Sequence, residues 1–282
     1  MSLNNFSGLE GEFSDYNKSK AVILPVPYEG TVTYGKGAAK GPSAIIEASK
    51  NMEKYDIELD KHTYKVGIHT LKPIEASHKD PQSIVNEVHK ASKKIVADNK
   101  FVVMLGGEHS ITTGLVKAYK EKFNDLSVLQ IDAHSDLRDN YKGTKYNHGC
   151  VMSRVREICP ITQVGIRSQE INEEKIDKKR IFFAKDIHNN DQWMDKAISQ
   201  LSSNVYITID LDGLDPSIMP STGTPEPGGL LWYQTIRFLK KLAKQKNIVG
   251  FDVVELAPIK ELHAPDFLAA KLIYKLIGYK FF

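Results

Sequence analysis

The sequence predicts an α/β protein, one three-layer α/β/α domain of residues 1–282 in which helices cover both faces of a central parallel sheet. Short runs rich in Val, Ile and Leu recur along the whole chain, and amphipathic helical patterns lie between many of them. No linker or shift in composition divides the chain, and 282 residues suffice for one large hydrophobic core.

The strand predictions rest on nearly continuous apolar runs, which are typical of strands that a parallel sheet buries on both faces. Because these runs alternate with helical patterns, we expect the strands to be parallel. The expected strands are Ala21–Pro27, Lys65–Leu71, Phe101–Leu105, Leu126–Ile131, Ile161–Arg167, Arg180–Asp186, Val205–Asp210 and Ile248–Glu255.

Four further segments place apolar residues at helical spacing. The first, Ile84–Val96, follows Asp80-Pro81-Gln82-Ser83, which is a suitable cap for the beginning of a helix. The longest irregular segment, Pro216–Gly229, is rich in Gly and Pro, and segments of this length in compact domains are usually functional or mobile. The other expected helices are Ile111–Phe123, Leu230–Ala243 and Phe267–Ile277.

Composition argues against several classes of function. The net charge of +3 is small, and no basic run is interleaved with aromatic residues, so no nucleic-acid partner is expected. The two cysteines, Cys150 and Cys159, lack the spacing of a zinc knot or a disulfide framework. The polar N-terminal segment resembles no secretory signal, and no apolar run is long enough to span a membrane. We therefore expect a cytoplasmic protein without a membrane partner.

The most informative motif is Asp132-Ala-His134-Ser-Asp136, which directly follows an expected buried strand. Residues two apart in an extended chain point the same way, so these three side chains are expected to face one point beyond the strand. Open α/β sheets bind their ligands at that edge. The alternative is that these polar groups only cap the next turn, but a histidine between two carboxylates favours a metal site.

Two other strand ends carry similar groups. Asp210-Leu-Asp212 ends another buried strand, and Gly106-Gly107-Glu108-His109 places a histidine at the beginning of a helix. Each motif alone is weak evidence, since turn capping or a solvent-facing histidine would explain it. Close carboxylates without a cation repel one another, whereas a bound cation removes this repulsion. Together the three strand ends predict a metal site.

Charge counting predicts two divalent cations, because four aspartates would be neutralised by two such ions. The two histidines add neutral nitrogen ligands, and the set contains no thiolate, which suits manganese while leaving zinc, iron or cobalt open. Two cations lower the pKa of a shared water and so produce a nucleophile near neutral pH. The expected ligands are His109, Asp132, His134, Asp136, Asp210 and Asp212.

These motifs, with Asp210-Leu-Asp-Gly-Leu-Asp-Pro216, Thr222-Gly-Thr-Pro-Glu-Pro-Gly-Gly229 and Phe251-Asp-Val-Val-Glu-Leu-Ala-Pro258, resemble the ureohydrolase family of arginases and agmatinases over nearly the whole chain. The resemblance implies an arginase-like parallel-sheet fold, two manganese ions, the same six ligands and a homo-oligomer, trimeric or hexameric. It also implies that His148 transfers protons to the leaving amine, that Asp136 helps to hold the attacking water, and that Glu255 binds the guanidinium group.

The resemblance is greatest to agmatinases, which implies hydrolysis of agmatine to putrescine and urea in polyamine biosynthesis. Arginases carry an asparagine where this chain has Arg138, which argues against arginine as substrate. Asp139 is a candidate contact for the amine of agmatine. Aminopropylagmatine, guanidinobutyrate and arginine stay open as alternatives. From other classes, a two-metal phosphoesterase and a metal-binding protein without catalysis are also considered.

Overall fold

The computed structural model describes residues 4–76, 79–170 and 177–282. In this part of the chain, eight strands form one sheet in the order β2-β1-β3-β8-β7-β4-β5-β6, and every paired strand runs parallel to its neighbour. The strands are β1 (Ala21–Val26), β2 (Ile68–Thr70), β3 (Phe101–Gly106), β4 (Leu126–Ile131), β5 (Ile161–Ile166), β6 (Ile181–Phe183), β7 (Asn204–Asp210) and β8 (Asn247–Val254).

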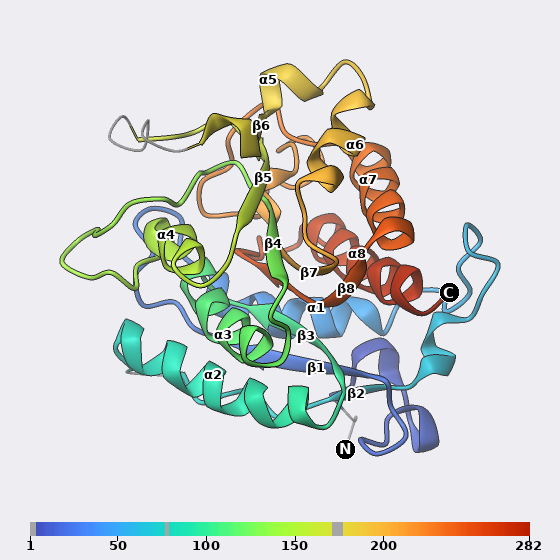
Figure 1. Cartoon of the computed structure of the whole chain (residues 1–282). Coiled ribbons are helices and arrows are strands. Elements are labelled where there is room, and N and C mark those ends of the chain that lie inside the picture. The colour runs from blue at the N-terminus through green and yellow to red at the C-terminus, as the bar shows by residue number, and fades with distance from the viewer. Residues whose placement is uncertain (1–3, 77–78, 171–176) are drawn as a thin grey trace.

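Helices cover both faces of the sheet, so the predicted three-layer architecture is confirmed (Figure 1). One face packs against α1 (Gly41–Ser49), α6 (Gln192–Ser199), α7 (Trp232–Gln245) and α8 (Ala264–Phe281). The opposite face packs against α2 (Pro81–Ala97), α3 (Thr112–Lys122) and α4 (Val151–Arg156). The short helix α5 (Ala184–Ile187) follows β6 directly.

All eight expected strands form, but the two at the edges of the sheet are shorter than predicted. The first residues of the expected strand Lys65–Leu71 instead belong to the 3-10 helix Thr63–Val66. Gly67 terminates this helix with a left-handed φ of 75°. In the expected strand Arg180–Asp186, α5 already begins at Ala184. Edge strands have a neighbour on one side only, so apolar residues next to them can join helices and turns instead.

The four expected helices are present as α2, α3, α7 and α8, each with bounds that differ by a few residues. Asp80 caps α2 as predicted, because its side chain accepts hydrogen bonds from the backbone N–H groups of Gln82 and Ser83. The helices α1, α4, α5 and α6 were not predicted from the sequence. Among the described residues, no helix has both the length and the apolar character needed to cross a membrane.

The order of the strands determines where a site can form. The consecutive strands β3 and β4 are not neighbours, because β8 and β7 lie between them. This change of direction in the winding is where open α/β sheets bind ligands, beyond the carboxyl ends of the strands. Gly107 follows β3 there, and a Cβ atom at this position would lie 1.8 Å from the carbonyl oxygen of Tyr28, so only glycine fits.

Candidate metal centre and active site

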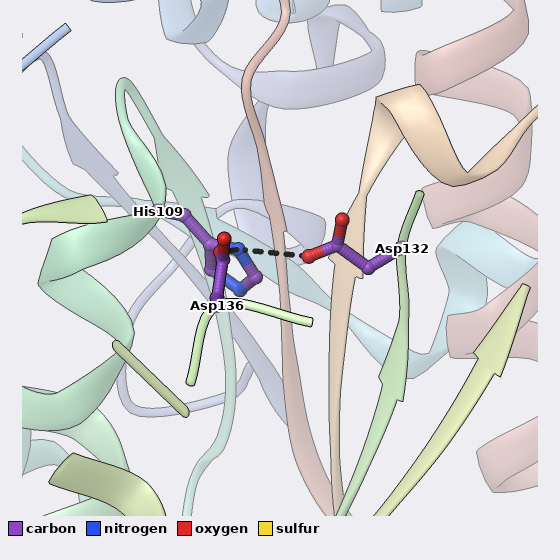
Figure 2. A group of neighbouring side chains, drawn as sticks. All are labelled: His109, Asp132 and Asp136. Carbon is purple, nitrogen blue, oxygen red and sulfur yellow. Dashed lines mark ion pairs between the residues drawn. The ribbon is translucent and has the colours of Figure 1, made fainter. Parts of the chain in front are cut away.

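The predicted ligands converge at the carboxyl ends of β3, β4 and β7. His109 begins a 3-10 helix after β3, and its ring is fully buried. Its Nδ1 lies 3.2 Å from Asp132 Oδ2, 3.2 Å from Asp136 Oδ2 and 3.3 Å from Asp210 Oδ2. Figure 2 shows Asp136 beside the His109 ring and Asp132 facing both from the end of β4. Three segments that are distant in sequence therefore supply one cluster.

A second cluster adjoins the first. His134 Nδ1 lies 2.9 Å from Asp212 Oδ2 and 3.7 Å from Asp132 Oδ1. Asp132 thus turns one carboxylate oxygen toward His109 and the other toward His134. Within the described part of the chain, two groups are suited to hold a cation: His109 with Asp132 and Asp136, and Asp132 with His134 and Asp212. The shared carboxylate places two candidate cation positions next to each other.

The donor atoms of this site fit divalent cations. The Nδ1 of His109 is buried without a hydrogen-bond partner, although three carboxylates surround it. A buried polar atom without a partner is costly unless another group completes its environment. The donor set consists of carboxylate oxygens and imidazole nitrogens, which suits manganese and related ions. The free cysteines Cys150 and Cys159 are not part of the two clusters.

The pKa values of the clustered groups indicate how strongly the site attracts positive charge. Burial and the neighbouring aspartates raise the pKa of Asp210 and of Asp212, and burial followed by Asp132 raises that of Asp136 to about 6. Against the effect of burial, hydrogen bonds to aspartates raise the pKa of His134 to about 12. Protons thus supply the positive charge that a cation would bring, so protons and cations compete for the site.

A buried chain of hydrogen bonds orients His109. Its Nε2 lies 2.8 Å from Thr208 Oγ1, and the Thr208 hydroxyl donates to Asp252 Oδ1 at 2.6 Å. Tyr206 and Thr112 donate to the other oxygen of Asp252 at 2.5 and 2.9 Å. Because the Thr208 proton is given to a carboxylate, its oxygen accepts from Nε2–H, and in the neutral ring Nδ1 is then the unprotonated nitrogen that faces the cluster. Such outer contacts fix the tautomer of a ligating histidine.

The local backbone differs from the extended geometry that the alternating motifs suggest. The strand β4 ends at Ile131, and Asp136 has a left-handed φ of 53°. Asp212 lies in a 3-10 helix, Leu211–Gly213, and donates its backbone N–H to Asp210 Oδ1 at 2.9 Å. The side chains do converge, but the explanation by simple alternation was wrong, because turns after the strand ends aim them.

The carboxylate of Glu255 lies at the same edge, after β8. Its Oε1 accepts the backbone N–H of His109 at 2.6 Å, and its own N–H donates to the carbonyl of Gly107 at 2.9 Å. Its φ of 64° is left-handed, a conformation that costs a non-glycine residue of order 1–3 kcal/mol. Burial, followed by the charge of Glu108, raises the pKa of Glu255 well above its ordinary value.

A cavity of about 160 Å³ opens beside both clusters. His148 and Glu255 line it together with five of the six predicted ligands, His109, His134, Asp136, Asp210 and Asp212, whereas Asp132 lies behind them in the cluster and is not part of the lining. Burial, followed by the charges of His109 and His134, lowers the pKa of His148 to about 4. The cavity wall also includes Val32, Thr33, Tyr34 and Gly35 from one loop, with Gly223 and Thr224 from another.

The two candidate specificity residues are placed differently. The Arg138 guanidinium carbon lies 4.3 Å from the centre of the Tyr141 ring, and both residues line the cavity. Asp139 is not among the lining residues; its exposed carboxylate pairs with Arg154 at 2.7 Å. The geometry therefore supports a selective role for Arg138 and offers none to Asp139.

We expect Arg138→Asn to change the choice of substrate more than the rate of the chemical step. The substitution removes a guanidinium group that lines the cavity, whereas the six ligand residues are left intact. The measurement is the ratio of kcat/KM for agmatine to that for arginine. Asp139→Asn serves as the comparison, since its carboxylate lies outside the cavity lining. An unchanged ratio in Arg138→Asn would show that this position does not select.

Several supporting residues were missed by the sequence-based reasoning. Arg167, after β5, donates to the carbonyl oxygens of Asp212 at 2.6 Å and Glu226 at 2.7 Å, and so ties the ligand turn to the Gly/Pro-rich segment. Thr208 lies two residues before Asp210, just as Asp212 lies two residues after it. This spacing could have identified Thr208 from the sequence. Nothing local in the sequence connects Arg167 to the carbonyl groups that it contacts.

Comparison with known proteins identifies the family. A family model described as the arginase family matches residues 19–278. The N(1)-aminopropylagmatine ureohydrolase of Synechocystis sp. is 42% identical over 285 residues, with 96% of this chain and 92% of that protein covered. An agmatinase of Pyrococcus horikoshii is 34% identical over 270 residues, with coverages of 94% and 93%. The chain belongs to the arginase family.

A solved structure agrees with this assignment. The agmatine ureohydrolase of Thermoplasma volcanium superimposes with a TM-score of 0.89 at 33% identity, covering 99% of this chain and 95% of that one. The predicted family, the arginase-like fold and the class of hydrolase are thereby confirmed. The roles of individual site residues, the trimeric or hexameric assembly and the cytoplasmic location stay predictions.

Proposed function

We propose that the chain hydrolyses a substituted guanidine to urea and an amine with the help of two divalent cations, with manganese favoured by the donor set. The observation that carries this proposal is the sharing of Asp132 between the His109 and His134 clusters beside one cavity. Glu255 and His148, which line the same cavity, add an anion for the guanidinium group and an imidazole for proton transfer.

When bound, the two cations supply Lewis acidity and lower the pKa of a water molecule, so that a nucleophile forms near neutral pH. The chain supplies the remaining functions. Glu255 orients the guanidinium plane through charge-assisted hydrogen bonds. Asp136 accepts a hydrogen bond from the attacking water. His148 takes up, at a ring nitrogen, the proton that the water loses on attack and delivers it to the amine as the C–N bond breaks.

For the substrate, the comparisons favour N(1)-aminopropylagmatine over agmatine, which was the leading prediction from sequence. The Synechocystis ureohydrolase named for that substrate is 42% identical, whereas the Pyrococcus agmatinase is 34% identical. Tyr34, which lines the cavity and is 79% exposed, offers an aromatic surface to the cationic chain of such a substrate. Cationic amines bind favourably over such rings.

We expect urea release with supplied manganese to be most efficient for N(1)-aminopropylagmatine, measured as kcat/KM. Agmatine, arginine and guanidinobutyrate are the comparison substrates, and phosphate esters test the phosphoesterase alternative. Agmatine as the best substrate would restore the original prediction. No urea from any of the four compounds would reject the proposed activity and favour a metal-binding protein without catalysis.

A further inference from the structure

A second buried chain of hydrogen bonds runs from a carboxylate to His148. Glu108 is fully buried, and its Oε2 accepts the backbone N–H of Thr31 at 2.6 Å. Its Oε1 lies 2.8 Å from Thr31 Oγ1. The same Thr31 oxygen lies 3.0 Å from His148 Nδ1 and accepts the His148 backbone N–H, also at 3.0 Å. Thr31 therefore joins two residues that are distant in the sequence.

The hydrogen-bonding capacity of a hydroxyl group determines the direction of this chain. The Thr31 hydroxyl has one proton to donate and two lone pairs that accept. Its three partners are the Glu108 carboxylate, which accepts, the His148 N–H, which donates, and His148 Nδ1. With the proton given to Glu108, the remaining lone pair accepts from Nδ1. The Nδ1 of His148 then carries a hydrogen, and in the neutral ring Nε2 is the basic nitrogen.

We propose that Thr31 is a positioning residue that holds His148 in the Nδ1–H tautomer, so that Nε2 exchanges protons with substrate, and that Glu108 fixes Thr31 in this role. The proposal rests on the proposed function, since it concerns the proton transfer assigned to His148. The arrangement parallels the Asp252–Thr208–His109 chain, in which a threonine committed to a carboxylate also sets a histidine tautomer.

Thr31→Val tests the proposal with little change of shape. The variant keeps the backbone N–H that binds Glu108 but loses the hydroxyl that holds the ring. We expect kcat to fall about 10–100-fold, as for the loss of other outer supporting contacts, with KM and bound manganese unchanged. Thr31→Ser is the matched control, because it keeps the hydroxyl and should keep kcat close to that of the wild type.

Glu108→Gln is a second, independent variant of nearly the same shape. To accept the Thr31 N–H, the amide must turn its oxygen toward that group, which brings its NH₂ to the Thr31 hydroxyl. Thr31 would then receive a hydrogen bond and give its own proton to His148 Nδ1, which reverses the tautomer. We expect a loss of kcat similar to that of Thr31→Val, with the manganese content measured alongside because His109 is adjacent.

Two results would overturn the proposal. A wild-type kcat in Thr31→Val would show that the hydroxyl does not act on His148, and an equal loss in Thr31→Ser would show that packing, not the hydroxyl, matters. Both results would leave urea release by the wild-type protein intact. Failure of the proposed function is distinguishable, because then the wild-type protein itself would release no urea.

Discussion

His134→Ala is expected to bind less manganese and to release urea more than about 100-fold more slowly. This loss is larger than the loss of activity that follows when a contact outside the ligand set is removed. The imidazole adjoins both Asp212, at 2.9 Å, and Asp132, at 3.7 Å. Alanine leaves these two carboxylates with one nitrogen donor fewer. Metal content by elemental analysis and urea release with saturating manganese measure the two effects.

The control for this substitution is His188→Ala, which removes an exposed histidine whose Nδ1 lies 3.0 Å from the carbonyl of Lys185. It should leave both metal content and activity unchanged. Full manganese stoichiometry in His134→Ala would contradict a ligand role for this residue. Loss of activity in both variants would indicate a general defect of folding instead.

Glu255→Gln is expected to lower kcat/KM by about 100-fold or more while manganese binding is kept. The amide is nearly the same size and its oxygen can still accept the N–H of His109, but the negative charge that faces the guanidinium group is lost. Removing one member of a buried charge pair costs about 2–5 kcal/mol. The measurement is urea release over a range of substrate concentrations, together with metal analysis.

Glu261→Gln provides a matched control for the Glu255 variant. Glu261 also has a left-handed backbone, with φ of 67°, but its side chain is exposed and pairs only with Lys260 among the contacts that the structure describes. Its substitution should not change activity. Unaltered kcat/KM in Glu255→Gln would show that this carboxylate does not bind the guanidinium group.

The long elements could be predicted from sequence because each has a strong local pattern. The buried strands are nearly continuous in Val, Ile and Leu, and α2 combines amphipathic spacing with the Asp80 cap. The short helices could not be predicted in the same way. Helix α4 has only 6 residues and α6 only 8, and isolated helices of that length are not stable in water. Their stability comes from packing against the sheet.

The candidate site also has parts that could be predicted from local sequence patterns and parts that could not. The expected ligands lie in compact motifs at strand ends, so their approach to one another followed from the parallel sheet. The turns that aim Asp136 and Asp212 depend on backbone geometry beyond the strands. Thr31 could not be connected to His148 from sequence, because the contact spans 117 residues and both lie outside strands. Non-local side-chain contacts of this kind have no periodic signature.

The left-handed backbone at Asp136 and Glu255 has a consequence for protein engineering. Glycine adopts this conformation without steric cost, so a redesign guided by thermal stability alone would favour glycine at both positions. Each such change would delete a carboxylate that lines the cavity. Resistance to heat and catalytic competence therefore oppose each other at these two positions, and stabilising changes should be sought elsewhere in the chain.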